Sequence, residues 1–185
     1  CGWASFCREV LISWCLTNSA DKIGGPGTIL EIDESKFGKR KYNVGRLIEG
    51  QWVYGGVCRE CWNFFFIPVP SRDAETLLAI IKDRVKEGTT IISDCWKAYS
   101  CLKKEGFQHL TVNHSLNFVD PVTAAHTNTI ERKWREAKAK VPHYGRRKYH
   151  FSGYLARTMF QMSIPDSNQR LHRFLLAAAK LYPPQ

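Results

Sequence analysis

The order of the hydrophobic runs constrains the fold of this chain more than any other feature. Three short runs, over residues 28–33, 51–58 and 61–69, are rich in β-branched and aromatic residues and are separated by turn-like polar segments. Such runs predict strands, and strands that follow one another directly usually lie side by side. We therefore expect a meander of three strands.

The pattern changes after residue 70, where helical and strand periodicities begin to alternate. The predicted elements are a helix from Ser71 or Asp73 to Gly88, a strand over 89–94, a helix over 96–106, a strand over 109–114 and a helix over 127–140. Helices that alternate with strands indicate parallel crossover units. The whole order predicts an α/β fold of the ribonuclease H-like type, with a mixed five-stranded sheet flanked by helices on both faces.

Helical periodicity also marks both ends of the chain, over residues 3–16, 151–164 and 167–181. The predicted organisation is a leading helical segment over 1–21, the α/β domain over 22–164, and a C-terminal helix and tail over 165–185. Because the chain begins at Cys1 rather than Met, we expect it to be a fragment of a longer protein.

Acidic residues occur where this fold would bring them together. Asp33 ends the first strand and Asp94 ends the fourth, and the strand holding Asp33 is expected to be central, with the other parallel beside it. Glu131 lies near the start of the helix over 127–140. Carboxylate oxygens suit Mg²⁺, and two ions about 4 Å apart can activate a nucleophile and stabilise the leaving oxygen in phosphodiester transfer. Mutual repulsion should raise the pKa values of such carboxylates when metal is absent.

Each of these acids also has an ordinary structural interpretation. An aspartate at a strand end is often a turn former or a cap, and an exposed glutamate beside Lys and Arg usually belongs to a solvated helix face. Asn128, three residues before Glu131, is either an alternative oxygen ligand or a helix cap. The convergence of three acids in one fold favours the metal site.

The chain is basic, with a formal net charge of +10, which favours a polyanionic partner such as nucleic acid or an anionic membrane. No run of eighteen apolar residues occurs, so no membrane span is predicted. Bases follow the first acid directly and gather again after Arg132, interleaved with Trp134, which suits phosphates and stacked bases. The residues expected to bind DNA are Lys36, Lys39, Arg40, Lys41, Arg132, Lys133, Arg135, Lys138, Arg146, Arg147 and Lys148.

Seven irregularly spaced cysteines in 185 residues favour reduced thiols, and secretion is not expected. Cys58 and Cys61 form a CxxC, but no second pair completes four zinc ligands, so a hairpin is favoured over a zinc site. Among other residues, Trp96 is expected near the acids, and His126 is expected to cap or turn the chain rather than to orient a water or phosphate.

Five blocks occur in order along the chain: EIDESKFGKRKYNVGR, QWVYGGV, TTIISDCWKAY, LTVNHSLNFVDP and HTNTIERKWREAK. Together they resemble the transposase domain of Merlin-type DNA transposons, which is related to a group of bacterial insertion-sequence transposases. The resemblance implies a DDE triad in which Asp33 is the first acid, Asp94 the second and Glu131 the third. Some relatives have Asn at the third position. We prefer Glu131 to Asn128 because it supplies charge for metal and has Lys138 two turns along the same face.

The resemblance further implies an activity and its partners. The expected function is DNA transposition, by cleavage at transposon ends and strand transfer into target DNA, with two Mg²⁺ or Mn²⁺ ions. Double-stranded DNA and a homodimer or larger synaptic complex are the expected partners. Residues 1–21 would be the remnant of an N-terminal DNA-binding region. The expected location is the nucleus in a eukaryote, or the cytoplasm and nucleoid in a bacterium.

Two other functions remain open from the sequence. One is a ribonuclease H-like nuclease that hydrolyses DNA without strand transfer. The other is a domesticated, transposase-derived DNA-binding protein without turnover. The presence of all three acids argues against the second, because binding alone would not need them.

Overall fold

The computed structural model of the protein describes residues 2–18, 21–38, 50–94, 97–99, 101–113, 119–121, 123–142 and 148–183. The chain forms two compact units, one over residues 21–135 and one that combines residues 1–20 with 136–185. The predicted domain boundaries at residues 22 and 164 stay a prediction. In the described parts of the chain, no helix is both long and apolar enough to cross a membrane.

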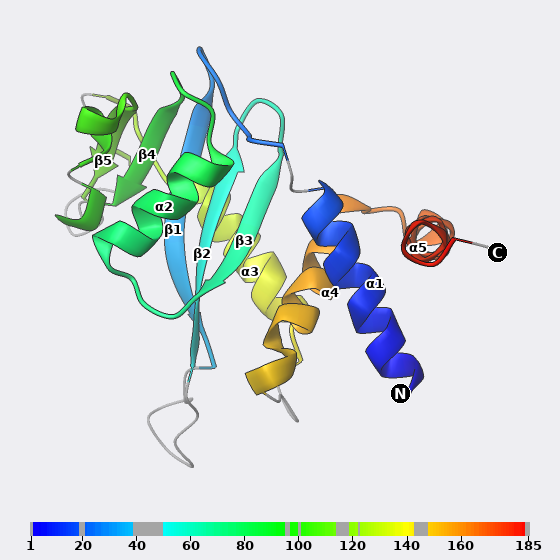
Figure 1. Ribbon diagram of the computed structural model, residues 1–185. Coiled ribbons are helices and arrows are strands. Elements are labelled where there is room, and N and C mark those ends of the chain that lie inside the picture. The colour runs from blue at the N-terminus through cyan, green and yellow to red at the C-terminus, as the bar shows by residue number, and fades with distance from the viewer. Residues whose placement is uncertain are drawn as a thin grey trace. The chain divides into compact units, whose positions relative to one another are not determined.

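The unit over residues 21–135 is built on one mixed sheet with the strand order β3-β2-β1-β4-β5 (Figure 1). The strands are β1 (Ile29–Phe37), β2 (Gln51–Cys58), β3 (Phe64–Val69), β4 (Thr90–Asp94) and β5 (Gln108–Val112). β1, β2 and β3 form an antiparallel meander, whereas β4 pairs in parallel with β1 and β5 pairs in parallel with β4. The predicted ribonuclease H-like α/β fold is confirmed.

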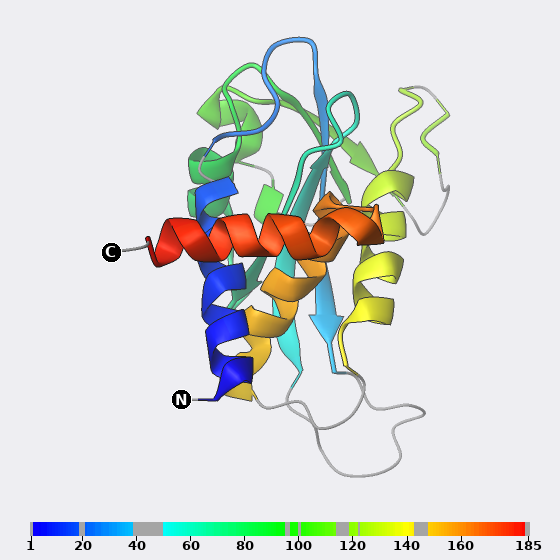
Figure 2. The same cartoon turned by 90° about the vertical axis from the view of Figure 1, so that its right-hand side faces the viewer.

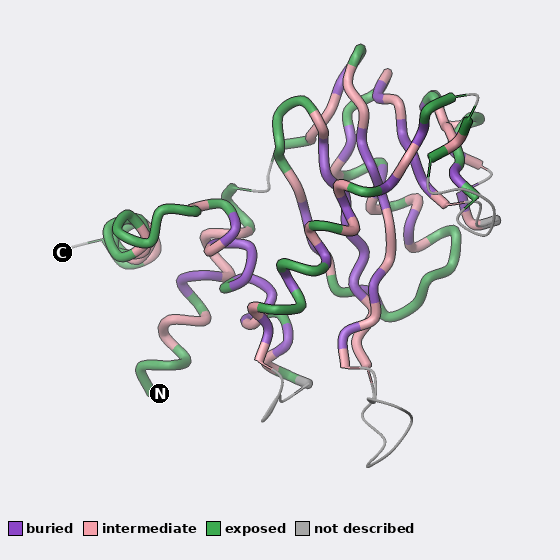
Figure 3. The backbone as a smooth tube through the Cα atoms, turned by 180° about the vertical axis from the view of Figure 1, so that it is seen from behind, coloured by how far each residue is buried: buried purple, intermediate pink, exposed green. Residues whose placement is uncertain are grey.

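Successive side chains of β1 point to opposite faces of the sheet, and the two faces carry different chemistry. Leu30 and Ile32 are fully buried in a core that includes Leu77 and Ile81 of α2 (Ala74–Arg84). The other face of β1 carries acids and faces the first turns of α3 (Asn128–Lys140). Figure 2 shows α2 and α3 on opposite sides of the sheet, and Figure 3 shows the buried central strands.

Helix α2 begins as predicted but ends early. Its N-cap is Asp73, whose carboxylate accepts a hydrogen bond from the main-chain N–H of Thr76 at 2.8 Å. The helix ends at Arg84, not at Gly88, because Ile23 takes over the backbone pairing: its N–H donates to the carbonyl of Arg84 at 2.8 Å. Ile23 and Arg84 are far apart in the sequence, so the residues around Arg84 do not by themselves indicate that the helix ends there.

The single helix predicted over residues 96–106 is wrong. The chain instead makes two short 3₁₀ helices, η2 (Lys97–Tyr99) and η3 (Leu102–Glu105). Each of them contributes one buried side chain, Tyr99 from η2 and Leu102 from η3, both 1% exposed. Gly106 ends the second of them at φ 84°, so its predicted role as a stop is confirmed.

The other unit contains three helices close to the predicted ranges: α1 (Trp3–Asn18), α4 (Phe151–Ser163) and α5 (Ser167–Leu181). Leu11, Ala156 and Phe160 form its small core. Gly153 permits close packing of α4 on α1, because a β-carbon there would lie 2.9 Å from Cγ of Arg8. Most residues of α5 are exposed (Figure 3).

Replacement of Gly56 by Ala tests the packing of the sheet. Its β-carbon would stand 2.6 Å from a ring carbon of Phe65, a core side chain that is 3% exposed. We expect Gly56→Ala to lower the free energy of unfolding by about 1–3 kcal/mol through overpacking. Urea denaturation measures it. Gly2→Ala, where nothing lies within 4 Å, is the control and should leave stability unchanged.

Candidate active site

The two predicted aspartates lie on neighbouring parallel strands at the same level. The β1–β4 pairing runs in step up to Glu31 opposite Ile92, and Asp33 and Asp94 stand two residues further on their respective strands. Side chains two residues apart share a face, so both carboxylates lie on the face of the sheet that carries Glu31. The predicted placement of these two acids side by side is therefore confirmed.

Glu131 reaches the same region from the first turn of α3. Its negative charge, with that of Asp94, acts on the carboxylate of Asp33. The hydroxyl of Thr127, just before the helix, donates to Oε1 of Glu131 at 3.4 Å. The fold thus brings both Asp94 and Glu131 within electrostatic range of Asp33.

A buried glutamate that was not among the predicted site residues fixes the start of α3. Glu31 is 0% exposed, and its Oε2 accepts a hydrogen bond from the main-chain N–H of Ile130 at 2.9 Å. The first N–H groups of a helix have no partner within the helix, and its N-terminus attracts negative charge. Glu31 of β1 therefore supplies the hydrogen-bond acceptor and the negative charge that a local N-cap residue usually supplies. The same contact attaches α3 to β1 beside Asp33.

Arg59 compensates the buried charge of Glu31. Its Nε lies 2.6 Å from Oε1 of Glu31, and its Nη2 donates to the carbonyl of His126 at 2.7 Å. The ring of His126 lies 3.0 Å from the same Nη2, so this histidine belongs to the anchor of α3. The sequence did hold a signal for Glu31, a charged residue between Leu30 and Ile32 in an apolar strand.

Trp134 orients the first acid. Its Nε1 donates to Oδ2 of Asp33 at 3.0 Å, while the main-chain N–H of Glu34 donates to Oδ1 at 2.8 Å. The indole stacks on Phe66 with ring centroids 4.4 Å apart and covers Gly55, where a β-carbon would lie 2.6 Å from it. Trp134 is only 4% exposed, so the prediction that it stacks DNA bases is wrong.

Two carboxyl groups at the site have strongly raised pKa values. Burial, together with the charges of Asp94 and Glu131, raises the pKa of Asp33 to about 6. Burial and the charges of Asp33 and Asp94 raise the pKa of Glu34 to about 8, against an opposing effect of Arg72. The rise expected for clustered carboxylates is thus found at Asp33. Glu34 lies on the α2 face, where the hydroxyl of Tyr99 donates to it.

The remaining predicted residues fall into two groups. Four of those that the structure places are exposed: Asn128, Arg132, Arg135 and Lys138. Two others lie against aromatic rings. The Nζ of Lys133 lies 4.6 Å from the ring centroid of Phe64, and the Nζ of Lys36 lies 5.5 Å from that of Trp52. The others lie outside the described residues or have undescribed side chains: Lys39, Arg40, Lys41, Trp96, Arg146, Arg147 and Lys148.

Within the described part of the chain, no group of three or more His, Cys, Asp or Glu side chains is arranged as a metal-binding cluster. Cys58 is buried at the end of β2, whereas Cys61 is exposed in the turn that leads to β3. Burial raises the pKa of the Cys58 thiol to about 11, which disfavours the thiolate that zinc needs. Asp33, Asp94 and Glu131 likewise do not form such a cluster in this structure.

The ion pair between Arg59 and Glu31 can be tested by removing one partner. We expect Arg59→Met to lower the free energy of unfolding by about 3–5 kcal/mol, because Glu31 would keep an uncompensated buried charge. Adding Glu31→Gln, which removes the charge but keeps an acceptor for Ile130, should restore much of the loss. Denaturant titration measures both. Lys82→Met, which breaks a half-exposed pair with Glu105, should cost less than about 1 kcal/mol, and an equal loss would contradict the role of Arg59.

The raised pKa of Glu34 predicts a pH dependence of stability. Folding raises this pKa from 4.5 to about 8, so the folded protein holds a proton that the unfolded chain releases in that range. The stabilisation is complete below pH 4.5 and is lost as the pH rises towards 8. Glu34→Gln should therefore flatten the fall of unfolding free energy over this range, measured by denaturation at a series of pH values. Glu75→Gln, on the exposed side of α2, should leave the profile unchanged.

Solved structures that align with this chain include viral integrases. A chain of the simian T-cell lymphotropic virus intasome, in complex with the PP2A regulatory subunit B56 gamma, aligns with a TM-score of 0.48 and 16% identity over 77% of this chain. The alignment spans about half of that chain, 51%. The catalytic core domain of BIV integrase aligns with a TM-score of 0.48 and 14% identity over 83% of this chain and 97% of its own. At these low values, the fold assignment rests on the strand order.

Sequence comparison gives the family. An uncharacterized transposase-like protein of Haemophilus influenzae (strain Rd) is 32% identical over 92 residues, which cover 49% of this chain and 73% of that protein. The ISXO2-like transposase domain matches residues 27–163, a span that includes the whole sheet and all three predicted acids. The chain therefore belongs to the ISXO2-like transposase domain family, a group of bacterial insertion-sequence transposases.

Proposed function

We propose that this chain is the catalytic domain of a DDE transposase that cleaves transposon ends and transfers them into target DNA. Asp33, Asp94 and Glu131 are the proposed catalytic acids. The observation that carries the proposal is their convergence on one face of the sheet, where Asp94 and Glu131 add charge repulsion to the carboxylate of Asp33. Proteins tolerate such repulsion mainly where chemistry requires it.

The donor chemistry of the site fits a divalent metal ion. Each oxygen of Asp33 accepts one hydrogen bond, which fixes the carboxylate and leaves a further lone pair on each oxygen. A bound cation would also favour the charged form of Asp33, against the burial and the neighbouring charges that raise its pKa. Asp33, Asp94 and Glu131 would hold Mg²⁺ or Mn²⁺, with Asn128 as the alternative third ligand. Two such ions would supply Lewis-acid stabilisation of the phosphodiester oxygens.

The proposed reaction has two steps that balance without any further reagent. In the first, a water oxygen bonds to phosphorus at the transposon end, the bond from phosphorus to the 3′ oxygen breaks, and a free 3′-hydroxyl results. In the second, that 3′-hydroxyl attacks a phosphodiester of target DNA, and a target 3′ oxygen leaves. The protein's share is to position the reacting groups and to keep the acids oriented, as Trp134 does for Asp33.

Basic residues that follow the acids along the chain are the proposed DNA contacts. Arg132 and Arg135 are exposed on α3, the helix that carries Glu131, and Lys138 follows on the same helix. Lys36 stands three residues after Asp33 on β1. The other bases assigned to DNA are Lys39, Arg40, Lys41, Lys133, Arg146, Arg147 and Lys148. Their summed charge would hold phosphates near the acids.

We further propose the type of mobile element, the oligomer and the cellular location of this enzyme. The motifs favour a Merlin-type element within the wider family, and joining two transposon ends requires at least a homodimer in the synaptic complex. Residues 1–21 would belong to an N-terminal DNA-binding region. Such an enzyme would act in the nucleus of a eukaryote or in the cytoplasm and nucleoid of a bacterium.

The proposed triad is tested on labelled duplex DNA that carries candidate transposon ends, with Mg²⁺, Mn²⁺ or EDTA. We expect metal-dependent cleaved and joined products that Asp33→Asn and Asp94→Asn reduce by at least about 100-fold, because each removes a charged metal ligand. Glu131→Gln and Asn128→Ala, compared side by side, identify the third ligand, and we expect the loss from Glu131→Gln.

Glu136→Gln is the matched control, because this exposed glutamate lies on the same helix and forms a surface ion pair with Lys140. It should keep full activity. Cleavage without joining would favour the nuclease alternative over strand transfer. Binding of DNA with no metal-dependent chemistry would favour the domesticated DNA-binding protein and would contradict the proposal.

A further inference from the structure

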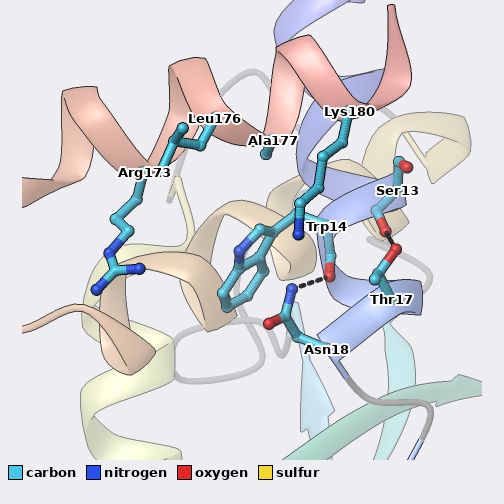
Figure 4. Close-up of a pocket in the computed structure, with 8 residues that line it drawn as sticks. All are labelled: Ser13, Trp14, Thr17, Asn18, Arg173, Leu176, Ala177 and Lys180. Atoms are coloured by element: carbon cyan, nitrogen blue, oxygen red, sulfur yellow. Dashed lines mark hydrogen bonds between the residues drawn. The ribbon is translucent and has the colours of Figure 1, made fainter. Parts of the chain in front are cut away.

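The helical unit contains a pocket that the proposed reaction does not use. It lies between α1 and α5, and its volume is about 180 Å³. Trp14 and Asn18 line it from α1, and Arg173 and Lys180 line it from α5 (Figure 4). All of these residues belong to the same compact unit, outside the unit that carries the proposed acids.

The pocket combines positive charge with an aromatic surface. Arg173 and Lys180 are seven residues apart, two turns along one face of α5, and Figure 4 shows the indole of Trp14 between them. The residues described as lining the pocket include these two cations and no acid. The sequence from residue 167 to the end also contains no Asp or Glu. The chemistry suits a ligand that is both anionic and flat.

The size of the pocket limits what such a ligand can be. Pockets that enclose a free small molecule usually have volumes of about 300 Å³ or more. At about 180 Å³, this pocket admits only a part of a larger molecule, whose remainder stays outside. A nucleic acid strand has the required form, because flat bases alternate with phosphates along it.

Trp14 is held in place before any ligand binds. Its ring packs edge-on against Phe160 of α4, with centroids 5.0 Å apart at an angle of 82°. A fixed indole loses little conformational freedom when a base stacks on it, which favours binding.

We propose that this pocket binds one nucleotide of single-stranded DNA, with the base stacked on Trp14 and the adjoining phosphates against Arg173 and Lys180. This proposal rests on the proposed function in one respect, the choice of DNA as the nucleic acid. It adds a defined single-strand contact through Trp14, Arg173 and Lys180, in the unit that carries none of the proposed catalytic acids.

Binding is measured by fluorescence anisotropy with a fluorescein-labelled single-stranded oligonucleotide in EDTA, on the full chain carrying Asp94→Ala. Trp14→Leu should weaken binding about five-fold or more, the lower end of what a stacked base contributes. The same variant should have little effect with an abasic strand of equal length. Arg173→Gln and Lys180→Gln should each reduce the slope of log K against log salt by about 0.7.

Arg157→Gln is the matched control, because this arginine is exposed on α4 in the same unit and does not line the pocket. Its salt slope should equal that of the parent chain. Equal slopes for the Arg157 and Arg173 variants would overturn the phosphate contact, and they do so even if Trp14→Leu disturbs the packing on Phe160. An equal loss on the abasic strand would overturn stacking, and an equal loss with duplex DNA would overturn the choice of single strands.

Because this assay uses no metal and a chain without Asp94, its result is independent of cleavage. If the pocket does not bind single-stranded DNA, the cleavage assay still tests the triad. If the triad is inactive, the anisotropy assay still tests the pocket.

Discussion

The arrangement of the site depends on the buried contact between Glu31 and the start of α3. A carboxylate with no exposure to water is costly, and here one oxygen is compensated by Arg59 and the other by the N–H of Ile130. The strand that carries Asp33, β1, thereby also holds the helix that carries Glu131. Without this contact, the first turn of α3, which carries Glu131, would lose its hydrogen bond to β1.

Trp134 and Gly55 complete that arrangement from the opposite side of Asp33. Gly55 faces Asp33 across the β1–β2 pair, and the missing side chain leaves room for the indole to lie flat and reach the carboxylate. The acid is therefore fixed by a neutral donor rather than by a cation. A neutral donor orients the carboxylate without cancelling its charge, so the charge remains available for a ligand from outside the protein.

Much of the fold could be predicted from the sequence, because it follows from local periodicity. The meander and the parallel pairing of the Asp94 strand with the central strand were predicted correctly, and this pairing placed Asp33 beside Asp94. The errors arose where distant contacts decide. The end of α2 is set by Ile23. Two 3₁₀ helices stand where one α-helix was predicted, and each buries one side chain in the core, Tyr99 and Leu102. Trp134 seemed a DNA contact because a run of bases surrounds it, yet its own side chain is in the core.

The anchor of α3 also fixes when the site is completed during synthesis. Glu31 and Ile130 are 99 positions apart, so the contact between them closes one of the longest loops in the fold. A nascent chain that has emerged only as far as β5 contains both aspartates but neither Glu131 nor the helix that Glu31 caps. On the proposed assignment, such an unfinished chain is harmless to DNA, and the ability to cut arises only when α3 docks.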